Sequence, residues 1–290
     1  MASQVVLITG CSQGIGKEAA LTLARDPQRR FKVYATMRNL ETRQADLKTE
    51  AGSFLNDTLF IRELDVTKQD TIDKIVKEII DNDGKIDVLV NNAAVICANW
   101  WETAPMETYY DIMEANYFGS VRMTKAVVPY MKEKRCGRIL QVASILGFHA
   151  IPVVTQYVAS KFALEGFSES IAPPLRKFNV WVSVIEPGCV KTNMVEQFGD
   201  EPTSIWINAA REIPGEEDRK IVTDLVSFDP EVVTGPVIQE TQEVAKLIQD
   251  VMLSPKPDYR YQTSQSIKKM AKKRFIDPSG NMIINDWLKG

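Results

Sequence analysis

The sequence contains very little histidine and cysteine. Its one histidine is His149, and its four cysteines are widely separated, with no CxxC pair. Zinc sites need clusters of cysteine and histidine, and disulfide frameworks need cysteines in matched pairs. The sequence therefore predicts no metal site and no disulfide bond, and we expect all four cysteines to be free thiols (Cys11, Cys97, Cys136 and Cys189).

Long apolar runs and an excess of one charge are also missing. No window approaches about 18 uninterrupted apolar residues, and the N-terminal MASQVVLITG has neither the basic region nor the apolar core of a secretory signal. The 35 Lys and Arg residues are offset by 38 Asp and Glu residues, so the chain lacks the basic field that marks nucleic-acid-binding proteins. We therefore predict a cytoplasmic protein with no nucleic-acid partner.

What the chain does contain is a regular alternation of short apolar runs and helical patterns. With 290 residues, 44% of them hydrophobic, it is long enough to bury a sizeable core. Such alternation implies right-handed crossovers between parallel strands. The prediction is an α/β, Rossmann-type doubly wound parallel sheet with helices on both faces, in one domain spanning 1–290. The predicted strands are 5–8, 31–38, 58–66, 86–94, 138–144 and 180–188, and the predicted helices among them include 17–25, 68–81 and 108–118.

A glycine-rich turn follows the first predicted strand and leads into a helix. Glycines let the backbone turn tightly and approach a pyrophosphate, which would lie against the N-terminus of the helix. The spacing is GxxxGxG rather than GxGxxG, so the signal gains its strength from its place in a βα unit. We expect a dinucleotide to contact this turn, at Thr9, Gly10, Ser12, Gln13, Gly14, Ile15 and Gly16.

The ends of the following strands predict the rest of the dinucleotide site. Met37 and Arg38 occupy the position where NAD-selective sites usually place an acid, and an arginine there favours the 2′-phosphate of NADP(H). The alternative is that Arg38 is only a solvated charge at a strand end. At the next strand ends, Asp65 and Val66 are predicted to contact the adenine, and Asn91 to Ala93 the ribose. The alternative for Asn91 and Asn92 is a simple turn. Thr192 is predicted to contact the nicotinamide.

Three polar residues, Ser144, Tyr157 and Lys161, are predicted to meet, and we call them the polar trio. Tyr157 and Lys161 are four residues apart in a segment with helical apolar spacing, so their side chains lie on one face, one turn apart. Ser144 ends an apolar run that reads as a strand buried on both faces, and the loop between them is short enough to bring it to the helix. Tyr and Lys at this spacing also recur by chance on amphipathic helices, so the pair alone allows a structural interpretation.

The polar trio suits proton transfer coupled to hydride transfer at a carbonyl group. A free phenol has a pKa of about 10, and the ammonium group of Lys161 is predicted to lower the pKa of Tyr157. Tyr157 could then donate a proton to a carbonyl that is reduced, or accept one from an alcohol that is oxidised. The hydroxyl group of Ser144 would hydrogen-bond the same substrate oxygen.

Toward the C-terminus the alternation is lost. Residues 193–237 contain prolines and charged clusters without a periodic pattern, and we predict that this insertion is a substrate lid. Helical spacing returns at 239–253, an extended segment is predicted at 255–261, and a last helix at 266–275 belongs to a C-terminal extension, 262–290. This last helix carries a run of basic residues, Lys268, Lys269, Lys272, Lys273 and Arg274. We interpret the run as a solvated face, and the alternative is that it contacts an anionic membrane surface.

Taken together, these motifs resemble those of the short-chain dehydrogenase/reductase family. They are TGxxxGIG at 9–16, NNAA at 91–94, Asn116, Ser144, YxxxK at 157–161 and PGxVxT at 187–192. The phrases VVLITGCSQGIG, FKVYATMR and YVASKFALEGFSESIA are similar to the hydroxysteroid and retinol dehydrogenase branch. The resemblance covers nearly all 290 residues.

The resemblance implies roles for individual residues. It implies a catalytic tetrad of Asn116, Ser144, Tyr157 and Lys161. The sequence itself leaves two interpretations of Asn116 open, because a polar residue with poor helix propensity inside a predicted helix could mark a local distortion with a bound water or could face solvent. It also implies a homodimer and a hydrophobic substrate of the steroid or retinoid class. Further cofactor contacts are implied for Tyr157, Lys161, Pro187, Gly188 and Val190, and substrate contacts for Ser144, Ile145, His149, Ile151 and Tyr157.

Some residues depart from the family pattern. NNAA replaces the more usual NNAG, and Gln13 stands where this branch commonly has a second serine near the 2′-phosphate. The predicted lid contains no histidine to recognise a distal steroid oxygen, so oestrogen-like specificity is not implied. Two hypotheses follow: an NADP(H)-dependent oxidoreductase, or a nucleotide-binding sensor or scaffold without turnover. The second would have no need of the polar trio.

Overall fold

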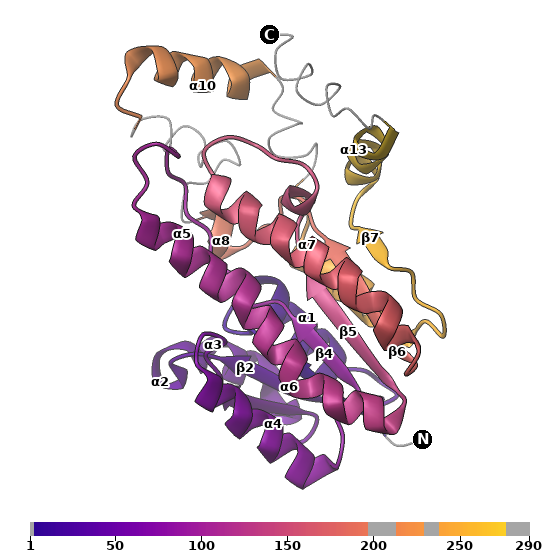
Figure 1. Ribbon diagram of the computed structural model, residues 1–290. Coiled ribbons are helices and arrows are strands. Elements are labelled where there is room, and N and C mark those ends of the chain that lie inside the picture. Colours follow the sequence, from indigo (N-terminus) through magenta and orange to yellow (C-terminus); the bar gives the residue numbers. More distant parts are fainter. Residues whose placement is uncertain (1–2, 197–212, 229–237, 277–290) are drawn as a thin grey trace.

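Seven parallel strands form one sheet in the order β3-β2-β1-β4-β5-β6-β7 (Figure 1). The structure is a computed structural model, and it describes residues 3–196, 213–228 and 238–276. The fold class predicted from the sequence is confirmed. The strands are β1 Gln4–Ile8, β2 Phe31–Met37, β3 Leu59–Glu63, β4 Val88–Asn91, β5 Gly137–Val142, β6 Val180–Glu186 and β7 Arg260–Gln262.

Helices cover both faces of the sheet (Figure 1). On one face lie α1 (Gly14–Ala24), α3 (Ala45–Ala51) and α12 (Thr241–Leu253), and on the other lie α4 (Gln69–Asp83), α6 (Gly119–Lys134) and α7 (Thr155–Arg176). Smaller elements complete the described chain. They are α2 Leu40–Arg43, η1 Gly52–Phe54, α5 Met106–Met113, η2 Glu114–Phe118, η3 Ile145–Gly147, α8 Asn193–Glu196, α10 Glu216–Phe228 and α13 Gln265–Ile276.

The central strand β1 shows why its apolar run forms a buried strand. Val6 and Ile8 pack into the hydrophobic cluster under α1 and α12, whereas Val5 and Leu7 pack into the cluster under α4 and α6. Strand side chains alternate between faces, so a strand covered on both sides must be apolar at every position. All four side chains are at most 2% exposed.

The strand order reverses at β1, which pairs with β2 on one side and with β4 on the other. In doubly wound sheets, the loops at the carboxyl ends of the strands diverge at such a point and leave a crevice there. The glycine-rich turn follows β1, and residues 92–95 follow β4. The topology therefore places the predicted dinucleotide turn at the natural binding crevice of the fold.

Helix boundaries differ from the sequence prediction at several places. The predicted helix 108–118 is two elements, because α5 ends at Met113 and a π-helical turn, η2, follows. The helix of the polar trio runs on through Pro173 and Pro174, although prolines usually end a helix. The predicted lid includes α8 and α10, while residues 197–212 and 229–237 of it lie outside the described residues, as does the end of the predicted extension, 277–290.

Candidate active site

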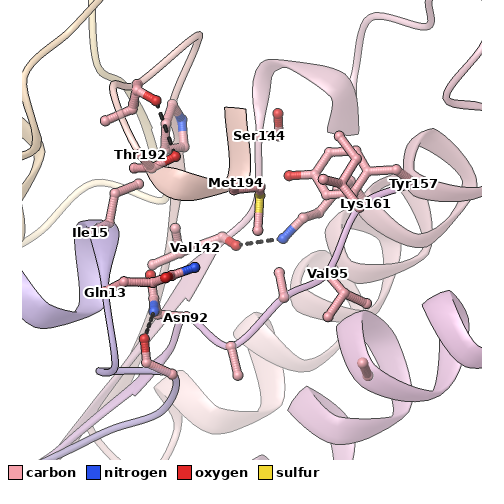
Figure 2. A pocket seen from close by; sticks show the side chains of 18 of the residues that line it. Gln13, Ile15, Asn92, Val95, Val142, Ser144, Tyr157, Lys161, Thr192 and Met194 are labelled. Carbon is pink, nitrogen blue, oxygen red and sulfur yellow. Dashed lines mark hydrogen bonds between the residues drawn. The ribbon is translucent and has the colours of Figure 1, made fainter. Parts of the chain in front are cut away.

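A cavity of about 470 Å³ lies along the carboxyl ends of the strands, and it runs from the end of β2 to the polar trio (Figure 2). Ser144, Tyr157 and Lys161 line it at one end, and Arg38 lines it at the other. The cavity therefore connects the predicted dinucleotide site with the predicted chemistry. Other predicted residues on its wall are Gly10, Ser12, Gln13, Gly14, Ile15, Asp65, Val66, Ala93, Ile145, Ile151, Pro187, Gly188, Val190 and Thr192.

The glycine-rich turn forms a cradle that fits a pyrophosphate. Gly10 and Gly14 have φ angles of 73° and 60°, which favour glycine. A Cβ on Gly10 would lie 2.7 Å from the Cα of Ala93, so the turn passes close to the chain after β4. Gln13, at the N-cap of α1, makes no side-chain capping hydrogen bond. The first N–H groups of α1 are therefore left for an anion, as a dinucleotide requires.

Two residues of the turn support the cavity rather than line it. The hydroxyl group of Thr9 accepts hydrogen bonds from the backbone N–H groups of Asn92 and Ala93, at 2.9 and 3.0 Å. A Cβ on Gly16 would lie 2.4 Å from both the Asn92 amide nitrogen and the Gly10 carbonyl oxygen, so Gly16 allows α1 to approach β4. Neither residue is on the cavity wall, and the cofactor contacts predicted for Thr9 and Gly16 stay predictions.

Of the two asparagines at the end of β4, Asn92 lines the cavity and Asn91 does not, so the ribose contact predicted for Asn91 stays a prediction. The Asn91 side chain is buried, and its amide donates to Thr124 Oγ1 at 3.1 Å, on α6. Asn92 lines the cavity, and its amide donates to the carbonyl oxygens of Thr9 and Gly10 at 2.9 and 3.1 Å (Figure 2). Because strand side chains alternate, Asn91 shares the face of Leu89 and turns toward α6.

At the β2 end of the cavity, Arg38 is exposed and lines the wall. Met37 is only 2% exposed and belongs to the hydrophobic core. An aspartate there would carry a charge into the core. The carboxylate of Asp65 accepts hydrogen bonds from Thr67 N and Thr67 Oγ1, at 3.0 and 2.8 Å. Asp65 is therefore held in a local turn beside the cavity.

The polar trio meets at the other end of the cavity, on β5, η3 and α7 (Figure 2). Ser144 caps η3, since its hydroxyl oxygen accepts a hydrogen bond from Leu146 N at 3.1 Å. The ammonium nitrogen of Lys161 donates to the carbonyl oxygen of Val142 at 3.0 Å and lies 5.4 Å from the centre of the Tyr157 ring. All three members are buried. The structure therefore brings together the three residues that the sequence predicted to meet.

Burial dominates the acid–base properties of the trio. It raises the pKa of Tyr157 to about 12, although a hydrogen bond with Ser144 lowers it in part. Burial lowers the pKa of Lys161 to about 8, against the raising effect of the Glu165 charge. The expected lowering of the Tyr157 pKa is not found, because the effect of burial outweighs that of the Ser144 hydrogen bond. Tyr157 is therefore a protonated phenol at neutral pH.

Asn116 lies in the π-helical turn η2, which confirms the predicted local distortion. Its side chain is 1% exposed. The amide bonds both the carbonyl and the N–H of Val95, at 2.9 and 2.8 Å, and donates to Ser160 Oγ at 3.0 Å. Its side chain thus fixes the loop after β4 against α7, and Asn116 is not on the cavity wall. Its predicted catalytic role stays a prediction.

A group of carboxylates around Arg260 holds the trio helix to the edge of the sheet. One guanidinium nitrogen of Arg260 lies 2.7 Å from Glu165 Oε2 and 2.5 Å from Glu186 Oε1. Glu165 and Glu186 are 5% and 0% exposed, and the exposed Glu169 is 3.3 Å from the other nitrogen. Burial and the charge of Glu186 raise the pKa of Glu165. This cluster was not visible in the sequence, because its members are up to 95 residues apart.

A change of Glu165 to glutamine is expected to flatten the pH dependence of stability. A carboxyl group whose pKa is raised on folding stabilises the protein below its unfolded pKa, and this stability is lost as pH rises through the folded pKa. The free energy of unfolding of the wild type should thus fall more steeply above pH 4.5 than that of Glu165→Gln. Urea unfolding at a series of pH values measures this. Glu169→Gln is the control, and parallel curves for Glu165→Gln and wild type would refute the assignment.

The trio end of the cavity has an apolar wall. Ile145, Leu146 and Ile151 line it, with Val154 and Met194. Ile213 and Val222, from the predicted lid, belong to one hydrophobic cluster with Ile151 and Val154. His149 is buried at 8% exposure and is not on the wall, and its predicted substrate contact stays a prediction. From α13, Ile267 and Ala271 pack on Ile145 and Phe148.

The described residues hold no group of three or more His, Cys, Asp or Glu side chains placed to bind a metal ion. No helix within 3–196, 213–228 and 238–276 is long and apolar enough to cross a membrane. Lys268, Lys269 and Lys272 on α13 are exposed. Contact of this basic face with a membrane surface stays a prediction.

Comparison with known proteins decides the family. The family model described as short chain dehydrogenase matches residues 4–203. The chain belongs to the short-chain dehydrogenase/reductase family. It is therefore an oxidoreductase of a family that uses NAD(H) or NADP(H). The resemblance that the motifs suggested is confirmed.

Two relatives of this short-chain dehydrogenase/reductase are similar along nearly the whole chain. Retinol dehydrogenase 8 of Bos taurus is 36% identical over 98% of this chain and 88% of its own length. Human 17-beta-hydroxysteroid dehydrogenase type 1 is 35% identical over 97% of this chain and 84% of its own length.

Solved structures share the fold. A short-chain dehydrogenase from Streptomyces avermitilis has a TM-score of 0.77 at 24% identity, over 99% of this chain and 97% of its own. The structure of ElxO with NADP bound has a TM-score of 0.73 at 22% identity, over 92% of this chain and 100% of its own. These likenesses support the Rossmann-like architecture.

Proposed function

We propose that this family member is an NADP(H)-dependent oxidoreductase that interconverts a hydroxyl and a carbonyl group on a hydrophobic substrate. The observation that carries the proposal is that the glycine-rich cradle, Arg38 and the polar trio all border the same cavity, with the polar trio at one end and Arg38 at the other. A steroid is the first candidate substrate, and retinol or retinal is the second. Both classes appear among the relatives that are about 35% identical.

The residues of the cavity divide the work of such a reaction. A reduced nicotinamide, when bound, supplies a hydride to the carbonyl carbon. Tyr157 donates the proton to the carbonyl oxygen, and its raised pKa keeps that proton in place at neutral pH. Ser144 donates a hydrogen bond to the same oxygen and so stabilises its developing charge. Lys161 lies beside Tyr157 and donates to the carbonyl oxygen of Val142, at the end of β5. Its positive charge stabilises the phenolate that Tyr157 becomes once its proton has left.

The apolar wall supports a hydrophobic substrate. Besides Lys161, no charged side chain of the described residues lines the trio end of the cavity. Ligand sites of this kind bury most of the ligand against apolar side chains and use a few polar groups to orient it. The homodimer and the cytoplasmic location predicted from the sequence stay predictions.

Turnover of a small panel of compounds tests the proposal. The purified protein is mixed with NADPH or NADH and a steroid ketone, retinal or a short polar ketone, and loss of the reduced cofactor is followed by absorbance. We expect turnover with NADPH and at least one of the two hydrophobic carbonyls, at a kcat/KM above that for the polar ketone. Equal or greater kcat/KM with the polar ketone would contradict the proposed substrate class.

Replacing Arg38 with alanine is expected to weaken NADP binding about tenfold to a hundredfold and to leave NAD binding nearly unchanged. A charge-assisted hydrogen bond contributes about 1.5–3 kcal/mol, which corresponds to this range. Calorimetric titration of both cofactors measures it. The control is Lys48→Gln, which removes an exposed positive charge of α3 that is not on the cavity wall. Equal losses for NADP and NAD on removing Arg38 would mean that Arg38 does not read the 2′-phosphate.

A further inference from the structure

A second arginine, Arg43, lines the cavity at the same end as Arg38. Both are exposed. Arg43 belongs to α2, a single turn of helix that directly follows the end of β2. The sequence gives no signal for it, because a four-residue helix carries no periodic pattern. Its position raises the question of what two cations at the β2 end would bind.

The local fold places Arg43 at the cavity. Asn39 is in the left-handed conformation, with φ 56° and ψ 61°, and this reverses the chain directly after Arg38. The backbone N–H and the hydroxyl of Thr42 both donate to the carbonyl oxygen of Asn39 at 3.2 Å, which closes the turn. Leu40 packs against the hydrophobic core. Residues three apart on a helix share a face, so the partly buried Leu40 places Arg43 on the side of α2 that borders the cavity.

The neighbouring cations are engaged elsewhere. Lys17 lies 2.7 Å from Glu50, and Arg25 donates to the carbonyl oxygen of the same residue at 2.6 Å. By contrast, no ion pair to Arg38 or Arg43 is found in the part of the chain that the structure describes. The one described acid on the cavity wall is Asp65, and Thr67 holds its carboxylate. At the β2 end, the side chains on the cavity wall thus carry two positive charges, from Arg38 and Arg43, and one negative charge, from Asp65.

We propose that Arg43 is a second ligand for the 2′-phosphate and that it sets cofactor choice together with Arg38. This inference rests on the proposed use of NADP(H). A phosphate monoester carries a charge of about −1.5 to −2 at pH 7 and has three acceptor oxygens. One guanidinium group cannot use all of these, because its planar fork matches two oxygens. Arg38 directly follows β2 and Arg43 lies on α2, so the two guanidinium groups can share one phosphate.

The experiment uses the full-length protein and four probes. NADP and NAD are titrated into the wild type, Arg43→Gln, Arg43→Lys and Lys48→Gln, and so are 2′,5′-ADP and 5′-AMP, which have no nicotinamide. We expect Arg43→Gln to weaken NADP and 2′,5′-ADP about tenfold, since the site is exposed and screened. NAD and 5′-AMP should change less than about twofold. Arg43→Lys should recover part of the loss, and Lys48→Gln should bind all four probes as the wild type does.

Salt dependence gives a second readout that a purely structural role would not move. Exposed charges are screened beyond about 8 Å at 0.15 M salt, so NADP affinity should fall with salt in the wild type. A plot of NADP affinity against salt concentration should have a shallower slope for Arg43→Gln than for the wild type, because one cation fewer faces the phosphate. A slope equal to that of the wild type, or equal losses of NADP and NAD, would overturn the assignment of Arg43.

The outcomes separate this inference from the proposed function. If the wild type binds NADP and NAD equally, the proposed cofactor preference fails, and the role of Arg43 fails with it. If the wild type prefers NADP and Arg38→Ala removes the preference while Arg43→Gln leaves it intact, only the inference about Arg43 fails. Similar selective losses in both variants support a shared phosphate site.

Discussion

Replacing Tyr157 with phenylalanine is expected to reduce turnover by about 10²–10⁴-fold, the contribution of a positioned general acid. The change removes one hydroxyl group and leaves the buried ring in place, so the hydrophobic packing of α7 is kept. Affinity for NADP(H) should stay within about threefold of the wild type, because the turn and the arginines proposed to bind it are untouched. Steady-state rates and cofactor titration measure the two effects separately.

The matched control for this change is Tyr110→Phe. Tyr110 is 64% exposed on α5 and is not on the cavity wall. It loses the same atom and should keep wild-type turnover. If Tyr157→Phe also turned over at the wild-type rate, Tyr157 would not be the proton donor. An equal loss in the control would point to a general effect of removing a phenol.

Lys161→Met is expected to reduce turnover at least as strongly as Tyr157→Phe, and to weaken NADP(H) binding as well. Lys161 is 2% exposed, so methionine, which is of similar length and carries no charge, fills the same space. The ammonium group that faces Tyr157 is lost, and the Val142 carbonyl loses its donor. Unchanged turnover and cofactor affinity would contradict a role for Lys161 in both steps.

Lys161→Met is also expected to change how the free energy of unfolding depends on pH, which can be measured independently of turnover. The pKa of Lys161 is lowered to about 8 in the folded protein, from 10.5. Below the folded pKa the buried ammonium group therefore lowers stability, and this penalty disappears as pH rises to the unfolded pKa. Relative to Lys161→Met, the wild type should gain stability from pH 8 to pH 10.5. Chemical unfolding of both proteins across that range tests the sign, and Lys48→Met is the exposed control.

The sequence was informative where one local pattern determines the structure. A buried parallel strand followed by glycines is such a pattern, because it depends on residues within a single βα unit. The polar trio was also predictable, since a spacing of four on a helix fixes the Tyr157 and Lys161 pair. Alternation of strands and helices then implied the sheet, and the strand order agrees with it.

Strand ends and contacts over long distances were harder to predict. The alternation of β4 puts the Asn91 side chain on the face of Leu89, where it bonds Thr124, and this orientation could have been read from the sequence. The pKa of Tyr157 depends on burial, which no spacing reveals. The pairing of Glu165 with Arg260 joins residues 95 positions apart, and only the folded sheet edge brings them together.

The contact of α13 with η3 has a consequence for how the protein is synthesised. Ile267 and Ala271 cover Ile145 and Phe148, directly after Ser144. About 120 residues separate the two segments, and at about 5–20 residues per second the ribosome needs roughly 6–24 s to span them. The first strands can pair early, whereas the wall beside Ser144 stays uncovered in the nascent chain until α13 has emerged. A chain that ends before α13 would therefore leave this apolar surface exposed to chaperones and proteases.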